Sequence, residues 1–440
     1  MSVNSGRHCL SKIFQPVTIV SKTANLGRQD VTSKSQRLML ELGIIQQAVP
    51  GCFHFLPLGM KSLEKLIRIV DSEMLKIEGQ KVMFPGLIDS KLWKTSGRLE
   101  DSSELFQLKD RHNHDYLLSP THEEVASELI SRLGHISYKH YPLRLYQITV
   151  KYRDELKPRF GLMRGREFLM KDMYSFDTDV HSARKTYEEV CQCYDSIFKK
   201  IGVGFLKVLG TSGTMGGNLS HEYHYLAHVG EDRILLCQNC NYLANVQLSG
   251  SCKCPKCGEQ TKLDIKNSIE VGHTFFLGVK YSKSLKAHFL SKNAKPEVLQ
   301  MGSYGMGLSR LIAASVEVLS TEQEMRWPDS LAPYNIVILP PKAGSKEEAK
   351  TKNIAEKLYV ALEGQIEGLK DNVLLDDRLS LTLGRRFLDA KRVGYRYIVV
   401  INKRAADVVP LFEFNDIKTN TRLYLSENEL LTYIKDNTVF

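Results

Sequence analysis

The sequence of 440 residues lacks any long run of apolar side chains. A helix that crosses a bilayer needs about 18 or more mostly apolar residues in succession, and no segment qualifies. The apolar stretch near the N-terminus is broken by serine, lysine and Pro16, so it also lacks the hydrophobic centre of a secretory signal. We therefore expect a globular protein that neither spans a membrane nor enters the oxidising export route.

Acidic residues are missing from residues 1–29. This segment contains several Ser and Thr residues and four basic ones: Arg7, Lys12, Lys22 and Arg28. Such a composition is typical of mitochondrial transit peptides. We expect residues 1–34 to be a targeting presequence and the mature protein to reside in the mitochondrial matrix. The alternative is a basic N-terminus without a targeting role.

Nine cysteines do not indicate a disulfide scaffold in a chain of this length without a secretory signal. Five of them cluster, and the pairs Cys237-x2-Cys240 and Cys254-x2-Cys257 can supply four thiolates to a tetrahedral Zn²⁺ ion. Four thiolates leave no open position, so a bound zinc ion would be structural. The spacer between the two pairs is slightly shorter than is usual for zinc sites, and Cys252 competes as a ligand. The alternative is therefore a loop of free thiols.

The composition is that of a globular protein, and the charge favours an anionic partner. Hydrophobic residues make up 42% and charged residues 25%, and the length allows two or three domains. The net charge of +10 and the isoelectric point near 9.0 favour a phosphate-rich partner. A basic protein with no nucleic acid contact remains the alternative at this point.

Hydrophobic periodicity predicts helices over residues 60–78 and 182–201. Alternating apolar and polar residues in Leu145–Tyr152 and Glu167–Phe176 predict two strands, joined by a loop at 154–166 that is rich in Arg, Pro and Gly. This unit is a long hairpin with a basic tip. The Gly-rich segment around residues 209–223 should be a loop near a ligand.

The pattern changes after residue 330, so we expect one mixed α/β body over residues 35–330 and a separate domain over 331–440. Five segments of that domain alternate between strand and helix: 335–341, 346–362, 373–377, 384–393 and 395–402. This order predicts a small α/β domain with a mixed or parallel sheet.

The predicted hairpin carries Arg153 and Glu155 at the end of its first strand. An arginine fork can bridge a carboxylate and a phosphate, which adenylation requires because both negative reactants must be held together. Glu155 would accept from an adenine amino group, and Phe168 would stack on the base. Surface hairpins often carry arginine, so this arrangement alone is not specific.

A second element makes the arrangement specific. Gly302-Ser-Tyr-Gly-Met-Gly307 precedes a predicted helix, and Arg310 lies one turn into that helix. The glycines permit close approach of backbone to ligand, and Arg310 can reach distal phosphates. The alternative is a tight turn into a helix.

With these residues in view, the chain resembles the class II aminoacyl-tRNA synthetases. Residues 51–85, 145–176 and 301–317 are similar to motifs 1, 2 and 3 of that class. PTHEE at 120–124 and EVGHTFFLG at 270–278 resemble the prolyl enzymes specifically. So does KYRDELKPRFGLMRGREFLMKDMYSF at 151–176, which covers the end of the first hairpin strand, the loop and the second strand. The similarity covers nearly everything after the first 35 residues.

The resemblance implies an α/β (α+β) fold. It consists of an antiparallel catalytic sheet flanked by helices, with motif 1 at a homodimer interface, and a C-terminal α/β anticodon-binding domain. It also implies the substrates L-proline, ATP with Mg²⁺, and tRNA(Pro), and the reaction of a proline–tRNA ligase in mitochondrial translation.

The resemblance assigns site residues as well. Thr121 and Glu123 would hold the proline imino group, His273 would line the proline pocket, and Arg153 would clamp the proline carboxylate and the α-phosphate. The ATP contacts would come from Arg153, Glu155, Arg164, Phe168 and Arg310, and Glu222 would help to bind magnesium-ATP. Thr121 and Glu123 can also be read as a helix N-cap with a first-turn carboxylate.

Two further regions bear on function. Only about 40 residues separate Leu226 from Glu270, and the insertion at 231–268 is too short for the large editing domain of many bacterial relatives, so we expect no editing in cis. In the C-terminal domain, helix 384–393 should turn Phe387 and Leu388 inward. Its basic residues are expected to contact tRNA: Arg385, Arg386, Lys391 and Arg392.

Two rival interpretations remain. A class II synthetase for another amino acid, such as threonine or serine, is disfavoured by the prolyl form of PTHEE and EVGHTFFLG. A synthetase-like protein without catalysis is disfavoured because Arg153, Glu155 and Arg310 are all present.

Overall fold

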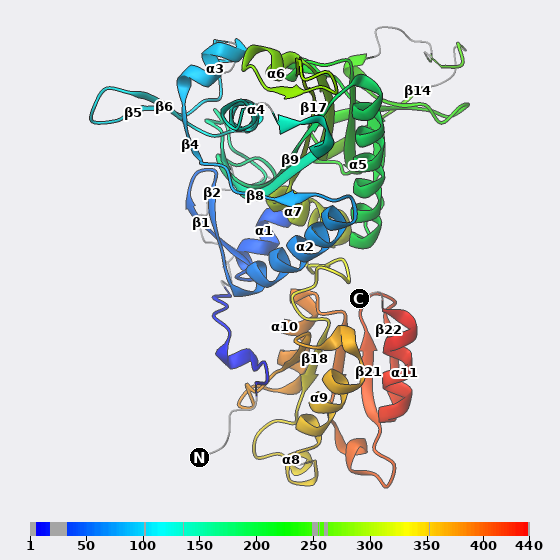
Figure 1. Ribbon diagram of the computed structural model, residues 1–440. Helices are drawn as coiled ribbons and strands as arrows, with labels where there is room; N and C mark the ends of the chain where they lie inside the picture. Colours follow the sequence, from blue (N-terminus) through cyan, green and yellow to red (C-terminus); the bar gives the residue numbers. More distant parts are fainter. Residues whose placement is uncertain are drawn as a thin grey trace.

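The computed structural model describes residues 6–17, 33–100, 103–134, 136–248, 254, 256–258, 263–351 and 353–438. They form two bodies (Figure 1). The larger one runs from helix α1 (Lys34–Glu41) to α7 (Leu308–Leu319), and the smaller one from strand β18 (Ile336–Leu339) to α11 (Glu427–Asn437). None of the helices in the described ranges combines the length and apolarity needed to cross a bilayer.

A nine-stranded sheet forms the centre of the larger body. In spatial order its strands are β11 (Leu219–Leu226), β10 (Leu206–Leu209), β13 (Leu243–Asn245), β12 (Asp232–Cys237), β14 (Leu263–Gly278), β17 (Gln300–Gly307), β9 (Glu167–Asp177), β8 (Leu143–Tyr152) and β3 (Gln80–Lys81). Neighbours are antiparallel except β10 with β13 and β3 with β8. The expected antiparallel sheet and both hairpin strands are confirmed.

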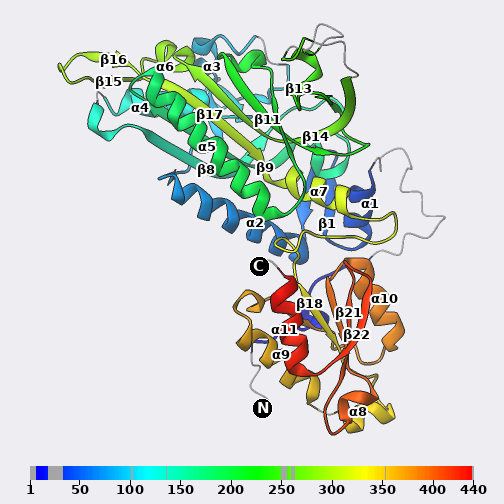
Figure 2. The same cartoon turned by 90° about the vertical axis from the view of Figure 1, so that its right-hand side faces the viewer.

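Helices α2 (Pro57–Lys76), α5 (Val180–Ile201) and α7 pack together on one face of this sheet (Figure 2). Helix α5 shows why: Tyr187, Tyr194 and Phe198 recur on one side and are buried. Cys191 and Cys193 are buried on the same helix, as expected for packing residues. The helix ends at Gly202, whose φ of 83° stops it in the left-handed region.

Shorter elements build a second core above the other end of the sheet. Its helices are α3 (Ser90–Ser96), α4 (Glu123–Arg132) and α6 (Lys280–Ser284). Its strands are β4 (Leu87–Asp89), β5 (Gln107–Lys109), β6 (Asp115–Leu118), β7 (Ile136–Ser137), β15 (His288–Leu290) and β16 (Pro296–Val298). A separate hairpin joins β1 (Ile45–Val49) and β2 (Cys52–Phe55).

The C-terminal body is a five-stranded mixed sheet, as expected. Its order is β19 (Val373–Leu375), β18, β20 (Tyr397–Val400), β21 (Phe412–Asp416) and β22 (Thr421–Leu425), and its helices are α8 (Lys346–Lys350), α9 (Ile354–Gln365), α10 (Leu383–Val393) and α11. The single helix expected over 346–362 is two helices, because Asn353 takes a left-handed φ of 65° between them. The antiparallel hairpin β21–β22 and helix α11 were not predicted.

The expected orientation of helix α10 was right for Phe387, which packs partly buried against the core, and wrong for Leu388. Arg386, Ala390 and Val393 form its buried side, whereas Leu388 is 64% exposed. Arg386 has no exposed surface, and its guanidinium donates to the main-chain oxygens of Asp376 at 3.1 Å and Pro340 at 2.6 Å. A side chain satisfied in this way cannot contact tRNA, so the prediction for Arg386 is corrected.

Basic residues of the C-terminal body bind the larger body through ion pairs. Lys391 Nζ lies 3.1 Å from Glu324 Oε1, and Arg392 Nη2 lies 2.5 Å from Glu41 Oε2. The indole N–H of Trp327, in the connecting segment, donates to the main-chain oxygen of Val393 at 3.0 Å. Charges that were expected to face RNA thus partly hold the two bodies together.

Residues 6–17 pack on the C-terminal body as an added edge (Figure 1). The Leu375 N–H donates to the His8 carbonyl oxygen at 2.9 Å, and the Ser11 hydroxyl donates to Asp377 at 2.5 Å. Leu10 is only 9% exposed. The rest of the expected presequence, residues 1–5 and 18–32, lies outside the described residues. Cleavage at residue 34 would remove these contacts, and the presequence boundary stays a prediction.

Replacing Leu10 with alanine should therefore destabilise the C-terminal body by about 2 kcal/mol, the lower end of the usual cost of a buried Leu→Ala change. Urea unfolding of the full chain would measure the change. Phe14→Ala is the matched control, because Phe14 lies in the same segment but is 67% exposed. Equal midpoints for Leu10→Ala and the unmodified chain would show that the segment does not stabilise the fold.

Candidate active site

Two adjoining cavities open beside strands β9, β14 and β17. The first has a volume of about 440 Å³ and the second of about 400 Å³. They share six lining residues: Glu104, Arg153, Met170, Glu270, His273 and Gly305. Arg153 therefore lies where a molecule in one cavity would meet a molecule in the other.

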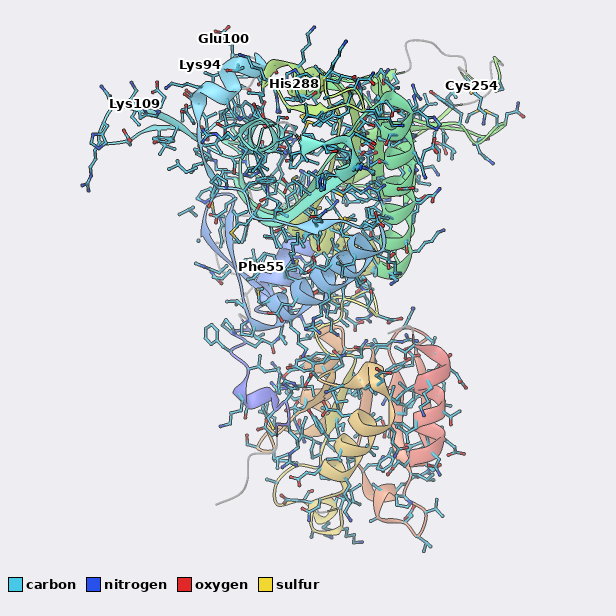
Figure 3. The ribbon with its side chains drawn as sticks, viewed as in Figure 1. Phe55, Lys94, Glu100, Lys109, Cys254 and His288 are labelled. Atoms are coloured by element: carbon cyan, nitrogen blue, oxygen red, sulfur yellow. The ribbon has the colours of Figure 1, made fainter. Side chains whose placement is uncertain are left out.

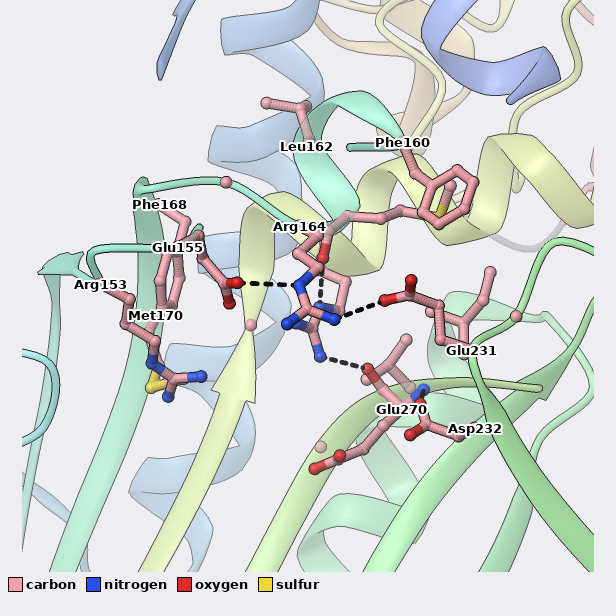
Figure 4. A pocket seen from close by; sticks show the side chains of 18 of the residues that line it. Arg153, Glu155, Phe160, Leu162, Arg164, Phe168, Met170, Glu231, Asp232 and Glu270 are labelled. Atoms are coloured by element: carbon pink, nitrogen blue, oxygen red, sulfur yellow. Dashed lines mark hydrogen bonds and ion pairs between the residues drawn. The ribbon is translucent and has the colours of Figure 1, made fainter. Parts of the chain in front are cut away.

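Arg153 follows directly after β8 and points into the first cavity (Figure 4). Its main-chain N–H donates to the Arg166 carbonyl oxygen at 2.8 Å, which fixes the backbone, and its guanidinium lies 5.2 Å from the ring centre of Phe168. Among the described residues, its side chain makes no hydrogen bond or ion pair. Burial, followed by the charge of Arg310, lowers the pKa of Arg153. Such a cation strongly favours an incoming anion.

Glu155 and Arg164 form the hairpin side of the first cavity. Arg164 Nε donates to Glu155 Oε2 at 2.9 Å, and Arg164 Nη1 donates to Glu231 Oε2 at 2.9 Å (Figure 4). Arg159 also pairs with Glu231. The hydrogen bond to Glu231 is the main reason that the pKa of Arg164 is raised. The structure thus brings together the residues that were expected to hold ATP on this side.

Arg310 lies opposite, in the first turn of α7. Its guanidinium donates to the main-chain oxygens of Met163 at 2.7 Å and Glu270 at 3.0 Å. These bonds hold the side chain at the cavity wall without neutralising its charge. Arg153 and Arg310 therefore present two cations to one cavity, which suits a polyphosphate.

Sequence reasoning missed the acidic wall of the first cavity, which consists of Glu231, Asp232 and Glu270. Burial pushes the pKa of Glu270 upward, but a hydrogen bond from His273 and the charge of Arg310 lower it to about 2. Burial, with the charge of Glu270, raises the pKa of Asp232. Glu270 begins the EVGHTFFLG segment, so its place beside His273 in the sequence was the available signal.

Thr121 and Glu123 meet in the second cavity. The Thr121 hydroxyl lies 2.7 Å from Glu123 Oε2, and the Ser303 hydroxyl donates to Glu123 Oε1 at 2.8 Å. Helix α4 begins at Glu123 with His122 as its N-cap, so Thr121 is not the cap. The carboxylate is completely buried yet lines the cavity.

Arg98 was not predicted, because nothing in its local sequence marks it. It is 6% exposed, stacks 4.3 Å from the Trp93 ring centre, and lies 3.2 Å from both Glu123 and Glu124. Burial raises the pKa of Glu124. Two carboxylates share one guanidinium, so the site accepts a further cation beside Glu123.

The rest of the wall of the second cavity is mixed: Trp93, Leu105, Met215 and Phe275 give it an apolar part, and Ser103, Asp172 and Thr214 are among its polar residues. His273 stacks on Phe275 with ring centres 3.8 Å apart. Its Nδ1 lies 3.0 Å from Glu270 and its Nε2 lies 2.6 Å from the Ser220 hydroxyl, so both ring nitrogens are engaged. His273 is therefore a wall of the cavity, as expected.

Glu222 is not brought together with the other ATP candidates. It lines neither cavity. Its carboxylate accepts from Asn245 Nδ2 and lies beside His224 Nε2, both at 2.9 Å, and it is 4.0 Å from His273. Its expected role in magnesium binding stays a prediction, and the contacts indicate a supporting position behind His273.

Known proteins resemble this chain over nearly its whole length. Residues 106–319 match the family model of the tRNA synthetase class II core domain (G, H, P, S and T). The chain is 44% identical to proteins of human and rat that are named probable mitochondrial proline–tRNA ligase. These alignments cover 98% and 97% of this chain, and 92% and 91% of the relatives.

Solved structures have the same fold. The prolyl-tRNA synthetase of Giardia lamblia gives a TM-score of 0.77 at 17% identity and covers 92% of this chain and 77% of that one. The enzyme of Cryptosporidium parvum gives 0.75 at 16% identity, with 92% and 76% covered. The full-length identity to the human and rat proteins goes further, and with the geometry above it means that this chain belongs to the proline–tRNA ligases, a family of class II aminoacyl-tRNA synthetases.

Proposed function

We propose that this chain activates L-proline with ATP at the two joined cavities and transfers the prolyl group to tRNA(Pro). The observation that carries the proposal is the Arg153 guanidinium, which faces both cavities and has no ion-pair partner among the described residues. One cation at a shared wall can draw a carboxylate and a phosphate to within reacting distance.

The second cavity suits proline. A secondary ammonium would lie against Glu123 and the Thr121 hydroxyl, the apolar ring against Trp93 and Phe275, and the carboxylate toward Arg153. The Giardia relative is described as a complex with prolyl-adenylate, and the Cryptosporidium relative as one with L-proline and AMP.

The first cavity suits ATP. Phe168 offers a ring face and Glu155 a buried acceptor for adenine, while Arg164 and Arg310 offer cations for the phosphates. The proline carboxylate would form a bond to the α-phosphorus as the bond to the β-phosphate breaks and pyrophosphate leaves. The ribose hydroxyl of tRNA would then take the prolyl group and release AMP. Arg153 stabilises the charge on the α-phosphate in the first step.

Magnesium fits the same cavity. Its wall provides carboxylate oxygens from Asp232 and Glu270, the ligand type that Mg²⁺ prefers, beside the arginines that would hold the phosphates. When bound, the ion would offset phosphate charge. The hydrogen bond from His273 and the charge of Arg310, which keep Glu270 ionised, are compatible with that task.

The C-terminal body is the proposed anticodon-binding domain, and residues up to about 330 are the proposed catalytic domain. Arg385 is the member of the predicted tRNA set with the most open side chain, which is 56% exposed. Lys391 and Arg392 keep partly exposed side chains beside their ion pairs with the larger body. We infer a tRNA contact that is centred on Arg385 and has Lys391 and Arg392 at its edge.

The names of the same relatives support a location, and the resemblance of residues 51–85 to motif 1 supports an assembly. The human and rat proteins are named mitochondrial, and residues 1–29 have the matching composition, so we propose import into the mitochondrial matrix. Residues 51–85 would form the homodimer interface. The insertion at 231–268 contributes β12, β13 and the beginning of β14, which leaves no length for a large editing domain, so we propose charging without editing in cis.

Arg153→Ala should lower proline-dependent ATP–pyrophosphate exchange by at least about 1,000-fold, because it removes the group that serves both reactants. The variant should unfold at the same temperature as the unmodified chain or higher, since a partly buried cation without an ion partner is lost. Lys157→Ala, on the exposed part of the same loop, is the control and should keep full activity. Normal exchange by Arg153→Ala, or exchange with another amino acid and none with proline, would refute the assignment.

Glu123→Gln should raise the KM for proline by roughly 10–100-fold, the value of a hydrogen bond to a charged group, and leave the KM for ATP within about twofold. Steady-state exchange kinetics separate the two constants. Glu128→Gln is the matched control, because Glu128 lies on the same helix and pairs with Arg132 at its surface. If the proline KM of Glu123→Gln is unchanged, the imino group is held elsewhere.

Arg385→Ala should raise the KM for tRNA in the charging reaction several-fold, less at higher salt because the lost phosphate contact is then screened, while exchange in the absence of tRNA stays unchanged. Lys435→Ala, an exposed change on helix α11, should affect neither reaction. Equal charging by the Arg385→Ala variant would remove helix α10 from the tRNA contact.

A further inference from the structure

Four cysteine sulfurs converge at the outer end of the larger body, away from both cavities. The Sγ atoms of Cys237, Cys240, Cys254 and Cys257 all lie within 4.8 Å of one another. The Cys237–Cys257 separation is 3.8 Å and the Cys240–Cys254 separation is 3.5 Å. A disulfide requires about 2.0 Å. Four thiolates bonded at about 2.3 Å to one tetrahedral ion lie about 3.8 Å apart. The separations fit the second arrangement.

Two matching turns produce this convergence. The Asn241 N–H donates to the Cys237 carbonyl oxygen at 3.1 Å, and the Gly258 N–H donates to the Cys254 carbonyl oxygen at 3.0 Å. Asn241 has a φ of 53° and Gly258 a φ of 70°. Asn and Gly are the residue types that tolerate this left-handed conformation. Each CxxC pair is thereby closed into a loop that directs both of its thiols to the same point.

Hydrophobic packing does not account for these thiols. Cys191 and Cys193 belong to the main core cluster, whereas Cys237 and Cys254 belong to none of the hydrophobic clusters formed by the described residues. Cys240 and Cys257 are partly exposed. Four sulfurs this close leave space for one ion but not for the several iron and sulfide atoms of a cluster.

We propose that Cys237, Cys240, Cys254 and Cys257 bind one Zn²⁺ ion, which fastens the outer end of the strand pair that forms the acidic cavity wall. Cys237 ends strand β12, which starts at Asp232 in the first cavity, and it pairs in register with Leu263 at the start of β14. Figure 3 shows Cys254 beyond the outer end of β14. Strand β14 then runs inward to Glu270 and His273.

The ion would act structurally, because four thiolates fill its coordination shell. It joins the turn between β12 and β13 to the segment that leads into β14, so the two strands are tied at their outer end. At their inner end, Asp232 and Glu270 are already joined, since the Glu270 N–H donates to Asp232 Oδ2 at 3.2 Å. Strand β13 adds Asn245, which donates to Glu222 behind His273.

Metal analysis of the full chain, purified under reducing conditions without chelators, should find about one zinc ion per chain. Cys240→Ser and Cys257→Ser should lose it. Cys52→Ser is the control, because Cys52 is a partly exposed cysteine in hairpin β1–β2, and it should retain the full amount. Stripped protein should take up one Co²⁺ per chain with the absorption of tetrahedral thiolate cobalt.

A second measurement does not depend on the folding of the variants. Zn²⁺ added to the stripped, unmodified chain should protect Cys237, Cys240, Cys254 and Cys257 from alkylation, as mapped by mass spectrometry, and leave Cys52 reactive. Zinc should also slow hydrogen exchange in β12 and the first half of β14 more than in α9. Iron in place of zinc, no uptake of Zn²⁺ or Co²⁺, or equal metal loss from Cys52→Ser and Cys240→Ser would overturn the proposal.

Discussion

The Arg153 guanidinium, which lines both cavities with no anionic side chain bonded to it among the described residues, is the constraint on which the larger body depends. Drawing a cation partly out of water costs free energy unless an anion is bonded to it. The cost is reduced by the face of Phe168 and by Glu104, Glu270 and Glu155, whose charges act on Arg153 from the surroundings. In the proposed function, two anionic substrates would offset the cost that remains.

Rigid strands make such an arrangement tolerable. Strands β8, β9, β17 and β14 are antiparallel neighbours, and the shared cavity residues Arg153, Met170, Glu270, His273 and Gly305 sit on them or directly after them. Buried polar contacts hold the second cavity in the same way. Lys151 lies 2.7 Å from Asp172, and the Tyr174 hydroxyl donates to Asp172 at 2.7 Å and accepts from the His122 N–H at 2.8 Å. This chain of hydrogen bonds runs from β9 to His122, between Thr121 and Glu123. Strand β9 therefore positions the two residues that are expected to hold the proline imino group.

Local sequence predicted the elements whose periodicity is strong and the residues that lie in continuous motifs. The hairpin, helices α2 and α5, and the positions of Arg153, Glu155 and Arg310 could all be anticipated. Arg98 could not, because it is 25 residues from Glu123 and is brought there only by the folding of α3 against α4. Helix α10 shows a different limit: a cluster of basic residues looks like an RNA surface in sequence, yet Arg386 is buried against carbonyl oxygens.

The same limit applies to the N-terminus, whose packing could not be predicted from its composition. Composition describes what a segment contains, whereas packing depends on which partner it finds, and the partner of residues 6–17 is strand β19, more than 350 residues away. The alignment with the human relative covers 98% of this chain, so most of residues 1–34 belongs to the shared region. An exposed strand edge such as β19 is a liability unless another segment covers it. The described residues near the N-terminus therefore cover the β19 edge and pack as part of the C-terminal body.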